Sequence, residues 1–175
     1  MRPNKDTYYL DIARAVAQRS TCLHRKYGAV IVNNDEIIAT GYNGAPRGED
    51  NCADVGTCWR DTHEKPINFA AAIHGDQYGT CVAVHAEQNA IISASRKDMQ
   101  GATLYLACTD SSVSIAPCNM CDRMIKNAGI IRVVVQWQIC SMTDWLTLRR
   151  VAQENQSTGK TKMFCGALLL IGSRL

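Results

Sequence analysis

Two short stretches of the sequence combine residue types that bind metals and move protons. The first is His85-Ala86-Glu87, and the second is the run from Pro117 to Cys121, which contains a Cys-x-x-Cys step. Such a step at the start of a helix aims both sulfurs one way, and the helix N-terminus favours the thiolate form that metals require. Two thiolates and one imidazole give zinc three protein ligands and leave the fourth position to water, as in catalytic sites. Water bound in that position ionises near neutral pH, so the two stretches predict hydrolytic chemistry.

Glu87 has a separate task in this arrangement. A carboxylate that is not needed as a ligand can take a proton from the water and hand it on. Positions two apart on a regular helix point to nearly opposite sides, so His85 and Glu87 line one site only if His85 lies in the very first turn. The pattern H-x-E followed by P-C-x-x-C is the signature of zinc nucleobase deaminases, which attack C4 of cytosine or C6 of adenine and release ammonia.

Two other interpretations of these residues stay open at this point. A Cys-x-x-Cys step is also typical of redox and structural sites, and His85 would then be unrelated to it. A zinc-stapled interaction module without catalysis needs neither an open metal position nor a special role for Glu87. The enzyme interpretation differs from both because it requires Glu87 for turnover but not for metal binding.

The hydrophobic pattern predicts the elements that position these residues. Apolar residues at helical spacing predict helices, and short β-branched runs predict strands. Asn33-Asn34-Asp35 separates the first two strands as a hairpin turn, Pro117 suits a helix start, and Gly129 ends that helix. The succession predicts a three-layer α-β-α fold, with a mixed sheet of about five strands and helices on both faces. The predicted helices span residues 6–20, 84–95, 117–127 and 142–154, with a short one at 68–74, and the predicted strands are GAVIVN, EIIATGYNG, TLYLAC, IIRVVVQW and, as a strand or a packed tail, MFCGALLLIG.

Length and composition limit the classes of function. The 175 residues fit a single domain, 1–175, and 46% hydrophobic with 20% charged residues is an ordinary globular balance. The net charge is only +3, with Lys and Arg scattered among acids, which argues against a nucleic-acid surface. The start of the chain has no secretory h-region and the longest apolar run, GALLLIG, is too short for a bilayer, so we expect a cytoplasmic protein without a membrane partner. Nine cysteines in a reducing compartment indicate metal binding or catalysis.

The sequence resembles the deoxycytidylate (dCMP) deaminase family of the cytidine deaminase superfamily. The resemblance covers most of residues 6–136 and depends on the stretches RSTC, GAVIV, GYNGAPRG, HAEQNAI and PCNMC. It implies a cytidine deaminase-like fold in which His85, Cys118 and Cys121 hold zinc. Glu87 is then the proton shuttle, and the reaction is hydrolysis of dCMP to dUMP with release of ammonia. Two alternatives stay open: an enzyme that accepts dCTP as well as dCMP, and a deaminase of a base within nucleic acid, which would need a basic channel and stacking aromatics.

The resemblance also implies contacts with nucleotides. Asn43 would hydrogen-bond the substrate near its sugar, with Ala86 as a further substrate contact. The stretch GYNGAPRG would contribute to an effector site, where dCTP activates and dTTP inhibits, with magnesium on the triphosphate. Members of the family are commonly homohexamers. Taken alone, the composition of GYNGAPRG is also typical of a Gly/Pro turn after a strand. The implied effector residues are Tyr42, Asn43, Gly44 and Arg47.

A substrate phosphate requires positive charge nearby. Arg25 and Lys26 lie just before the first predicted strand, and Arg123 lies in the helix that the cysteines open. Each can pair with a phosphate, although Lys and Arg are also the residues most often exposed to solvent. Arg25 and Lys26 are the predicted phosphate contacts.

The remaining cysteines offer a second metal site. Some members of the family carry a structural zinc near the corresponding segments, and four thiolates would close such a site and fasten the long loop. His63 or His74 can replace one thiolate, and the alternative is a set of free, partly buried thiols. Cys108, Cys140 and Cys165 lie in apolar runs and are predicted core residues. The candidate ligands of the second zinc are Cys22, Cys52, Cys58 and Cys81.

Overall fold

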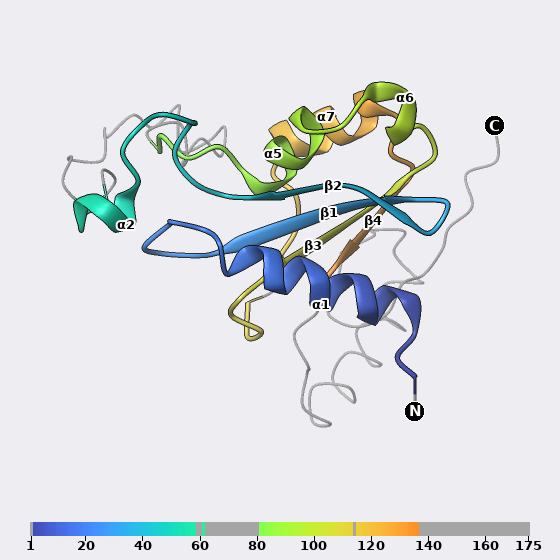
Figure 1. Ribbon diagram of the computed structural model, residues 1–175, viewed down its shortest axis with the longest axis horizontal. Helices are drawn as coiled ribbons and strands as arrows, with labels where there is room; N and C mark the ends of the chain where they lie inside the picture. Colours follow the sequence, from blue (N-terminus) through green and yellow to red (C-terminus); the bar gives the residue numbers. More distant parts are fainter. Residues whose placement is uncertain (1, 59–60, 62–80, 114, 137–175) are drawn as a thin grey trace, which may run out of the picture. The chain divides into compact units, whose positions relative to one another are not determined.

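The computed structural model describes residues 2–58, 61, 81–113 and 115–136 (Figure 1). Contacts divide the chain into one unit of residues 1–110 and 115–136 and another of residues 111–114 and 137–175. The fold below is that of the first unit. The predicted helices at 68–74 and 142–154, and the strand or tail at 163–172, lie outside the described residues, so the single domain stays a prediction.

A four-stranded mixed sheet forms the centre of this unit. Its strands are β1 (Tyr27–Asn33), β2 (Glu36–Tyr42), β3 (Thr103–Cys108) and β4 (Arg132–Val135), in the order β2-β1-β3-β4. β1 is antiparallel to β2 and to β3, whereas β3 and β4 are parallel. The mixed sheet is confirmed, with four strands in the described part of the chain.

The hairpin between β1 and β2 forms where the sequence predicts it. Asn34 and Asp35 connect the strands with φ angles of 48° and 69°. Left-handed conformations at both central residues match the right-handed twist of the flanking strands, and Asn and Asp tolerate them better than other side chains with a Cβ. The turn fixes which residues of β1 face each side of the sheet.

Helices cover both faces of the sheet, as predicted. α1 (Lys5–Ala17) packs on one face, and α5 (Ala86–Ile92), α6 (Arg96–Met99) and α7 (Asn119–Ala128) lie on the other (Figure 1). A further short helix, α2 (Cys52–Val55), follows β2. None of the described helices is long and apolar enough to cross a membrane. The core under α1 consists of Tyr9, Ala13, Val30, Val32, Tyr105 and Ala107.

Two glycines let helices lie directly against the sheet. A Cβ atom at Gly41 would overlap the carbonyl oxygen of Ala86 and the amide nitrogen of Ala90, so the start of α5 rests on the backbone of β2. Gly28 has the same role on the opposite face, where a Cβ atom would overlap the carbonyl oxygen of Ala13 in α1. The position of α5, which carries the His-x-Glu stretch, therefore depends on the absence of a side chain at residue 41.

This close approach makes a testable prediction. Gly41→Ala and Gly28→Ala should each lower the free energy of unfolding by about 1–3 kcal/mol, because each overpacks a helix–sheet contact. Only Gly41→Ala should also weaken zinc binding, since only α5 begins next to His85. Urea unfolding gives the stability, and competition with a chelator gives the metal affinity. Equal loss of metal affinity in both variants would contradict the assignment of Gly41 to the support of the site.

Candidate active site and metal centre

His85 precedes α5 as its N-cap residue. Its backbone is extended, with φ −71° and ψ 157°, and its N–H donates to Gln88 Oε1 at 2.9 Å. Because the His85 backbone is not helical, helix geometry does not fix the direction of its side chain. Glu87 lies in the first turn of α5. The sequence analysis requires His85 to lie at the very start of the helix if His85 and Glu87 are to line one site. The structure places His85 there, and both residues line the same cavity.

Cys118 has the matching position at the start of α7. It is the N-cap residue, and its Sγ accepts a hydrogen bond from the Cys121 N–H at 3.5 Å. Pro117 lies one residue before the cap, so the prediction that the helix includes Pro117 was wrong: α7 begins at Asn119. The cap keeps the Cys118 side chain at the helix N-terminus, beside that of Cys121 one turn into the helix.

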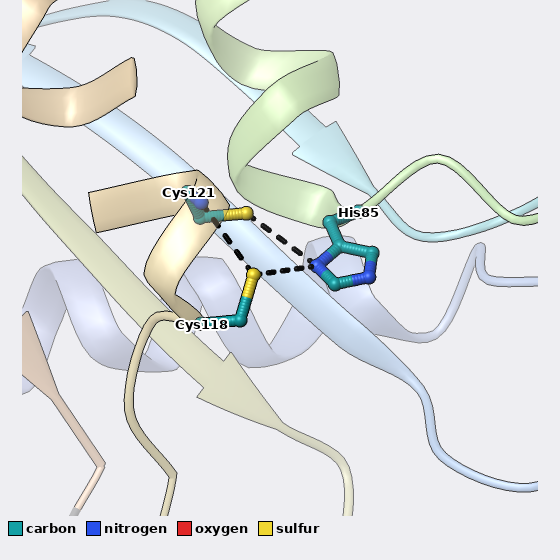
Figure 2. A group of neighbouring side chains, drawn as sticks. All are labelled: His85, Cys118 and Cys121. Atoms are coloured by element: carbon teal, nitrogen blue, oxygen red, sulfur yellow. Dashed lines mark hydrogen bonds between the residues drawn. The ribbon is translucent and has the colours of Figure 1, made fainter. Parts of the chain in front are cut away.

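The two helix starts bring three metal-binding atoms together. His85 Nδ1 lies 3.6 Å from Cys118 Sγ and 3.4 Å from Cys121 Sγ, and all three atoms lie within 4.8 Å of one another (Figure 2). With zinc–sulfur bonds of about 2.3 Å and a zinc–nitrogen bond of about 2.0 Å, tetrahedral geometry places nitrogen and sulfur about 3.5 Å apart. The observed separations fit a zinc ion with three protein ligands.

Burial and charge at the centre also suit a cation. Glu87 is 5% exposed, and this burial raises the pKa of its carboxyl, a shift that a backbone hydrogen bond and the nearby His85 oppose. Burial likewise raises the pKa of the Cys121 thiol far above its usual value, and the Glu87 carboxylate adds to the effect. A divalent cation stabilises the ionised forms of both groups, since a coordinated thiol is deprotonated outright. The donor set therefore fits zinc chemically as well as geometrically.

A cavity of about 470 Å³ opens beside these side chains. His85, Glu87 and Cys118 lie in its wall, so a molecule in the cavity reaches both the metal centre and the carboxyl group. The size is typical of small-molecule sites. The other described lining residues are Cys22, His24, Arg25, Tyr27, Asn43, Cys81, Ala83, Ala86, Leu106 and Ala116.

The predicted substrate residues differ in their relation to this cavity. Arg25 lies in the wall, as does Ala86, which is fully buried. Lys26 is exposed and is not among the described lining residues. Arg123 is also exposed, and its Nε donates to the Asn119 carbonyl within α7. All three candidate cations are exposed, and Arg25 is the one of them in the cavity wall.

The residues Tyr42, Asn43 and Gly44 connect separate parts of the site through hydrogen bonds. The Tyr42 carbonyl accepts from Asn89 Nδ2 of α5 at 2.7 Å. Gly44 exchanges two backbone hydrogen bonds with Val84, of 3.2 and 2.8 Å, immediately before His85. Arg47, the fourth predicted effector residue, is exposed. Only the resemblance singled out this stretch in the sequence, and its composition alone indicated a turn.

The four cysteines predicted to bind a second zinc do not gather into one group. Cys22, Cys52 and Cys81 are partly buried and Cys58 is buried. Among the described residues, Cys58 instead groups with two residues that the sequence analysis did not select, His24 and Asp61. His24 lies 37 positions from Asp61, so spacing in the sequence did not indicate the group as a whole. The four-cysteine site stays a prediction.

Comparison with known proteins identifies the family. Residues 3–137 match the cytidine and deoxycytidylate deaminase zinc-binding region. The chain belongs to this deaminase family. It is 43% identical over 138 residues to the deoxycytidylate deaminase of Mycobacterium phage D29, which covers 76% of this chain and 94% of the phage protein. The deoxycytidylate deaminase of Schizosaccharomyces pombe is 38% identical over 133 residues, which is 76% of this chain but 37% of that protein.

A solved deaminase structure shares the fold. The crystal structure of dCMP deaminase from the cyanophage S-TIM5 in complex with dCMP and dUMP matches with a TM-score of 0.53 and 27% identity. The match covers 85% of this chain and 93% of the cyanophage chain. The prediction of a cytidine deaminase-like fold is confirmed.

The geometry of this deaminase centre predicts which residues hold the metal. His85→Ala and Cys118→Ser should purify with less zinc than the unchanged protein, because each removes one of only three protein ligands. Cys108→Ala, at a fully buried cysteine of β3 outside the cluster, is the matched control and should keep its zinc. Elemental analysis of the purified proteins measures the zinc content. Full zinc in His85→Ala would place the metal elsewhere.

Proposed function

We propose that this protein catalyses the hydrolysis of dCMP to dUMP and ammonia. The observation that carries the proposal is the buried carboxyl group of Glu87 beside a His-Cys-Cys cluster that fits zinc, with Glu87, His85 and Cys118 in the wall of one cavity. The identity of 43% with a phage deoxycytidylate deaminase supports dCMP as the substrate. A non-catalytic zinc module would not need a buried carboxyl group at the cavity wall.

The residues of the chain divide the reaction between them. His85, Cys118 and Cys121 would hold the zinc ion, which would act there as a Lewis acid and activate water for attack on C4 of the base. Glu87 would accept the proton that this water loses and deliver it to the ring nitrogen N3, where it stays in the uracil product. It would then take the proton of the hydroxyl group formed at C4 and pass it to the amino group, which leaves as ammonia as the C4 carbonyl forms. Because Glu87 is 5% exposed, bulk water does not compete for that proton.

The cavity supports a small nucleotide better than a base within nucleic acid. Arg25 is the one Lys or Arg among the described residues that line it. One cation suits one phosphate group, whereas a nucleic-acid deaminase requires a basic channel with stacking aromatics for the flanking nucleotides. We propose dCMP as the preferred substrate and keep dCTP as the second candidate, since Arg25 can pair with either phosphate chain.

Regulation is part of the proposal. The stretch that contains Tyr42, Asn43, Gly44 and Arg47 is proposed to bind dCTP as an activator and dTTP as an inhibitor, with magnesium on the phosphates. The paired hydrogen bonds between Gly44 and Val84 support coupling, because they join this stretch to the residue before a metal ligand. The proposed enzyme is a cytoplasmic homohexamer built from a single domain.

A substrate panel tests the proposed reaction. Ammonia release should be fastest with dCMP when dCMP, dCTP, deoxycytidine and a cytosine-containing oligonucleotide are offered in turn. Glu87→Gln should lower kcat for dCMP by about 100- to 10,000-fold and still bind zinc, because the proton carrier is lost and the ligands remain. Preference for the oligonucleotide would overturn the choice of substrate. Full activity of Glu87→Gln would overturn the mechanism.

Effector kinetics test the proposed regulation. With magnesium present, dTTP should suppress dCMP turnover and dCTP should relieve the suppression, with a coupling free energy of about 1–3 kcal/mol. Arg47→Ala should weaken the response to both triphosphates, since Arg47 is exposed and is the only predicted effector residue with a positive charge. Identical kinetics with and without the triphosphates would leave GYNGAPRG as a turn.

A further inference from the structure

One wall of the cavity is made by the segment that joins α1 to β1. Residues 20–26 form neither helix nor strand. Four cavity-lining residues come from this segment and the first residue of β1: Cys22, His24, Arg25 and Tyr27. Their positions therefore depend on whatever fixes an irregular backbone in place.

Asn43 fixes that backbone at both ends. Asn43 Oδ1 accepts a hydrogen bond from the Tyr27 N–H at 2.7 Å, and Asn43 Nδ2 donates to the Arg25 carbonyl at 2.9 Å. The Asn43 N–H donates to the Tyr27 carbonyl at 3.2 Å. At the other end of the segment, the buried Ser20 hydroxyl donates to the Asn43 carbonyl at 2.7 Å. Asn43 is 7% exposed, so water does not compete strongly for these bonds.

The side-chain amide of Asn43 thus holds the peptide groups on both sides of Lys26. An amide of this kind forms up to four hydrogen bonds, and two of them are used on backbone. Arg25, whose carbonyl is one of these partners, is the one Lys or Arg among the described lining residues. Loss of the amide would remove one hydrogen bond from the Tyr27 N–H and one from the Arg25 carbonyl, and would let the Arg25 backbone move.

We infer that Asn43 is a positioning residue that sets the preference for a nucleotide over a nucleoside, because it holds the backbone from which Arg25 reaches the substrate phosphate. The inference rests on the proposed function. It differs from the sugar contact that the family resemblance implies for Asn43, since a sugar contact acts equally on dCMP and on deoxycytidine. Positioning acts only on the substrate that carries a phosphate.

A double-mutant cycle with two substrates separates these roles. Asn43→Ala should lower kcat/KM for dCMP by about 10- to 100-fold, mainly through KM. This is the value of the charged hydrogen bond between Arg25 and the phosphate, which the variant should lose. For deoxycytidine the loss should stay below about 3-fold, within the context dependence of a single neutral hydrogen bond. Arg25→Ala should cause the same selective loss, and the double variant should lose no more than Arg25→Ala alone.

Asn33→Ala is the matched control for the loss of side-chain hydrogen bonds to backbone. Asn33 Nδ2 donates to the Asp98 and Gln100 carbonyls at 2.8 and 3.1 Å, and Asn33 is not among the cavity-lining residues. This variant should lose some stability and keep its ratio of kcat/KM for dCMP over deoxycytidine. If Asn43→Ala does not fold, Asn43→Asp is the second variant. Its carboxylate accepts from the Tyr27 N–H but cannot donate to the Arg25 carbonyl, so it should show the same selective loss for dCMP.

Three results would overturn the inference. They are equal losses for dCMP and deoxycytidine in the Asn43 variants, additive losses in the double variant, and an unchanged substrate ratio in Arg25→Ala. Failure of the unchanged protein to deaminate dCMP would instead contradict the proposed function. The two failures are distinguishable because the second shows itself before any variant is made.

Discussion

The meeting of two helix N-termini on one face of the sheet is the constraint on which the site depends. His85 caps α5 and Cys118 caps α7, and the caps come close enough for an imidazole nitrogen to lie 3.4 and 3.6 Å from two sulfurs. The positive ends of both helices favour thiolates and a nearby carboxylate. Buried anionic groups of this kind are unstable without a compensating cation, and a bound zinc ion would supply that charge.

The end of β2 and the two residues after it connect this centre to the rest of the cavity. Tyr42 is tied to α5, Asn43 to the segment before β1, and Gly44 to the residue that precedes His85. Three consecutive residues thereby contact the helix of the proton carrier, the wall that carries Arg25 and the residue before a metal ligand. These short hydrogen-bonded connections support the proposal that an effector at this stretch acts on chemistry and on substrate binding.

Most of the scaffold and of the metal centre could be predicted from the sequence because the signals are local. Apolar periodicity gave the helices and strands, Asn34-Asp35 suits a left-handed turn, and His-x-Glu with Pro-Cys-x-x-Cys has a fixed meaning. The hydrogen bonds of the Asn43 side chain to the Tyr27 and Arg25 backbone could not be predicted, since these partners lie 16 and 18 positions away. The group of His24, Cys58 and Asp61 could not be predicted either, because His24 lies 37 positions from Asp61. Spacing by itself indicates ligands that lie close in the sequence, such as Cys118 and Cys121, and not partners that come from distant segments.

The most direct test of the central claim is a crystal structure of the purified protein with anomalous data at the zinc absorption edge. It should show zinc at bonding distance from His85 Nδ1 and from the sulfurs of Cys118 and Cys121, with solvent as the fourth ligand and Glu87 beside that solvent. A fourth protein side chain on the zinc, or no zinc between these three atoms, would contradict the account.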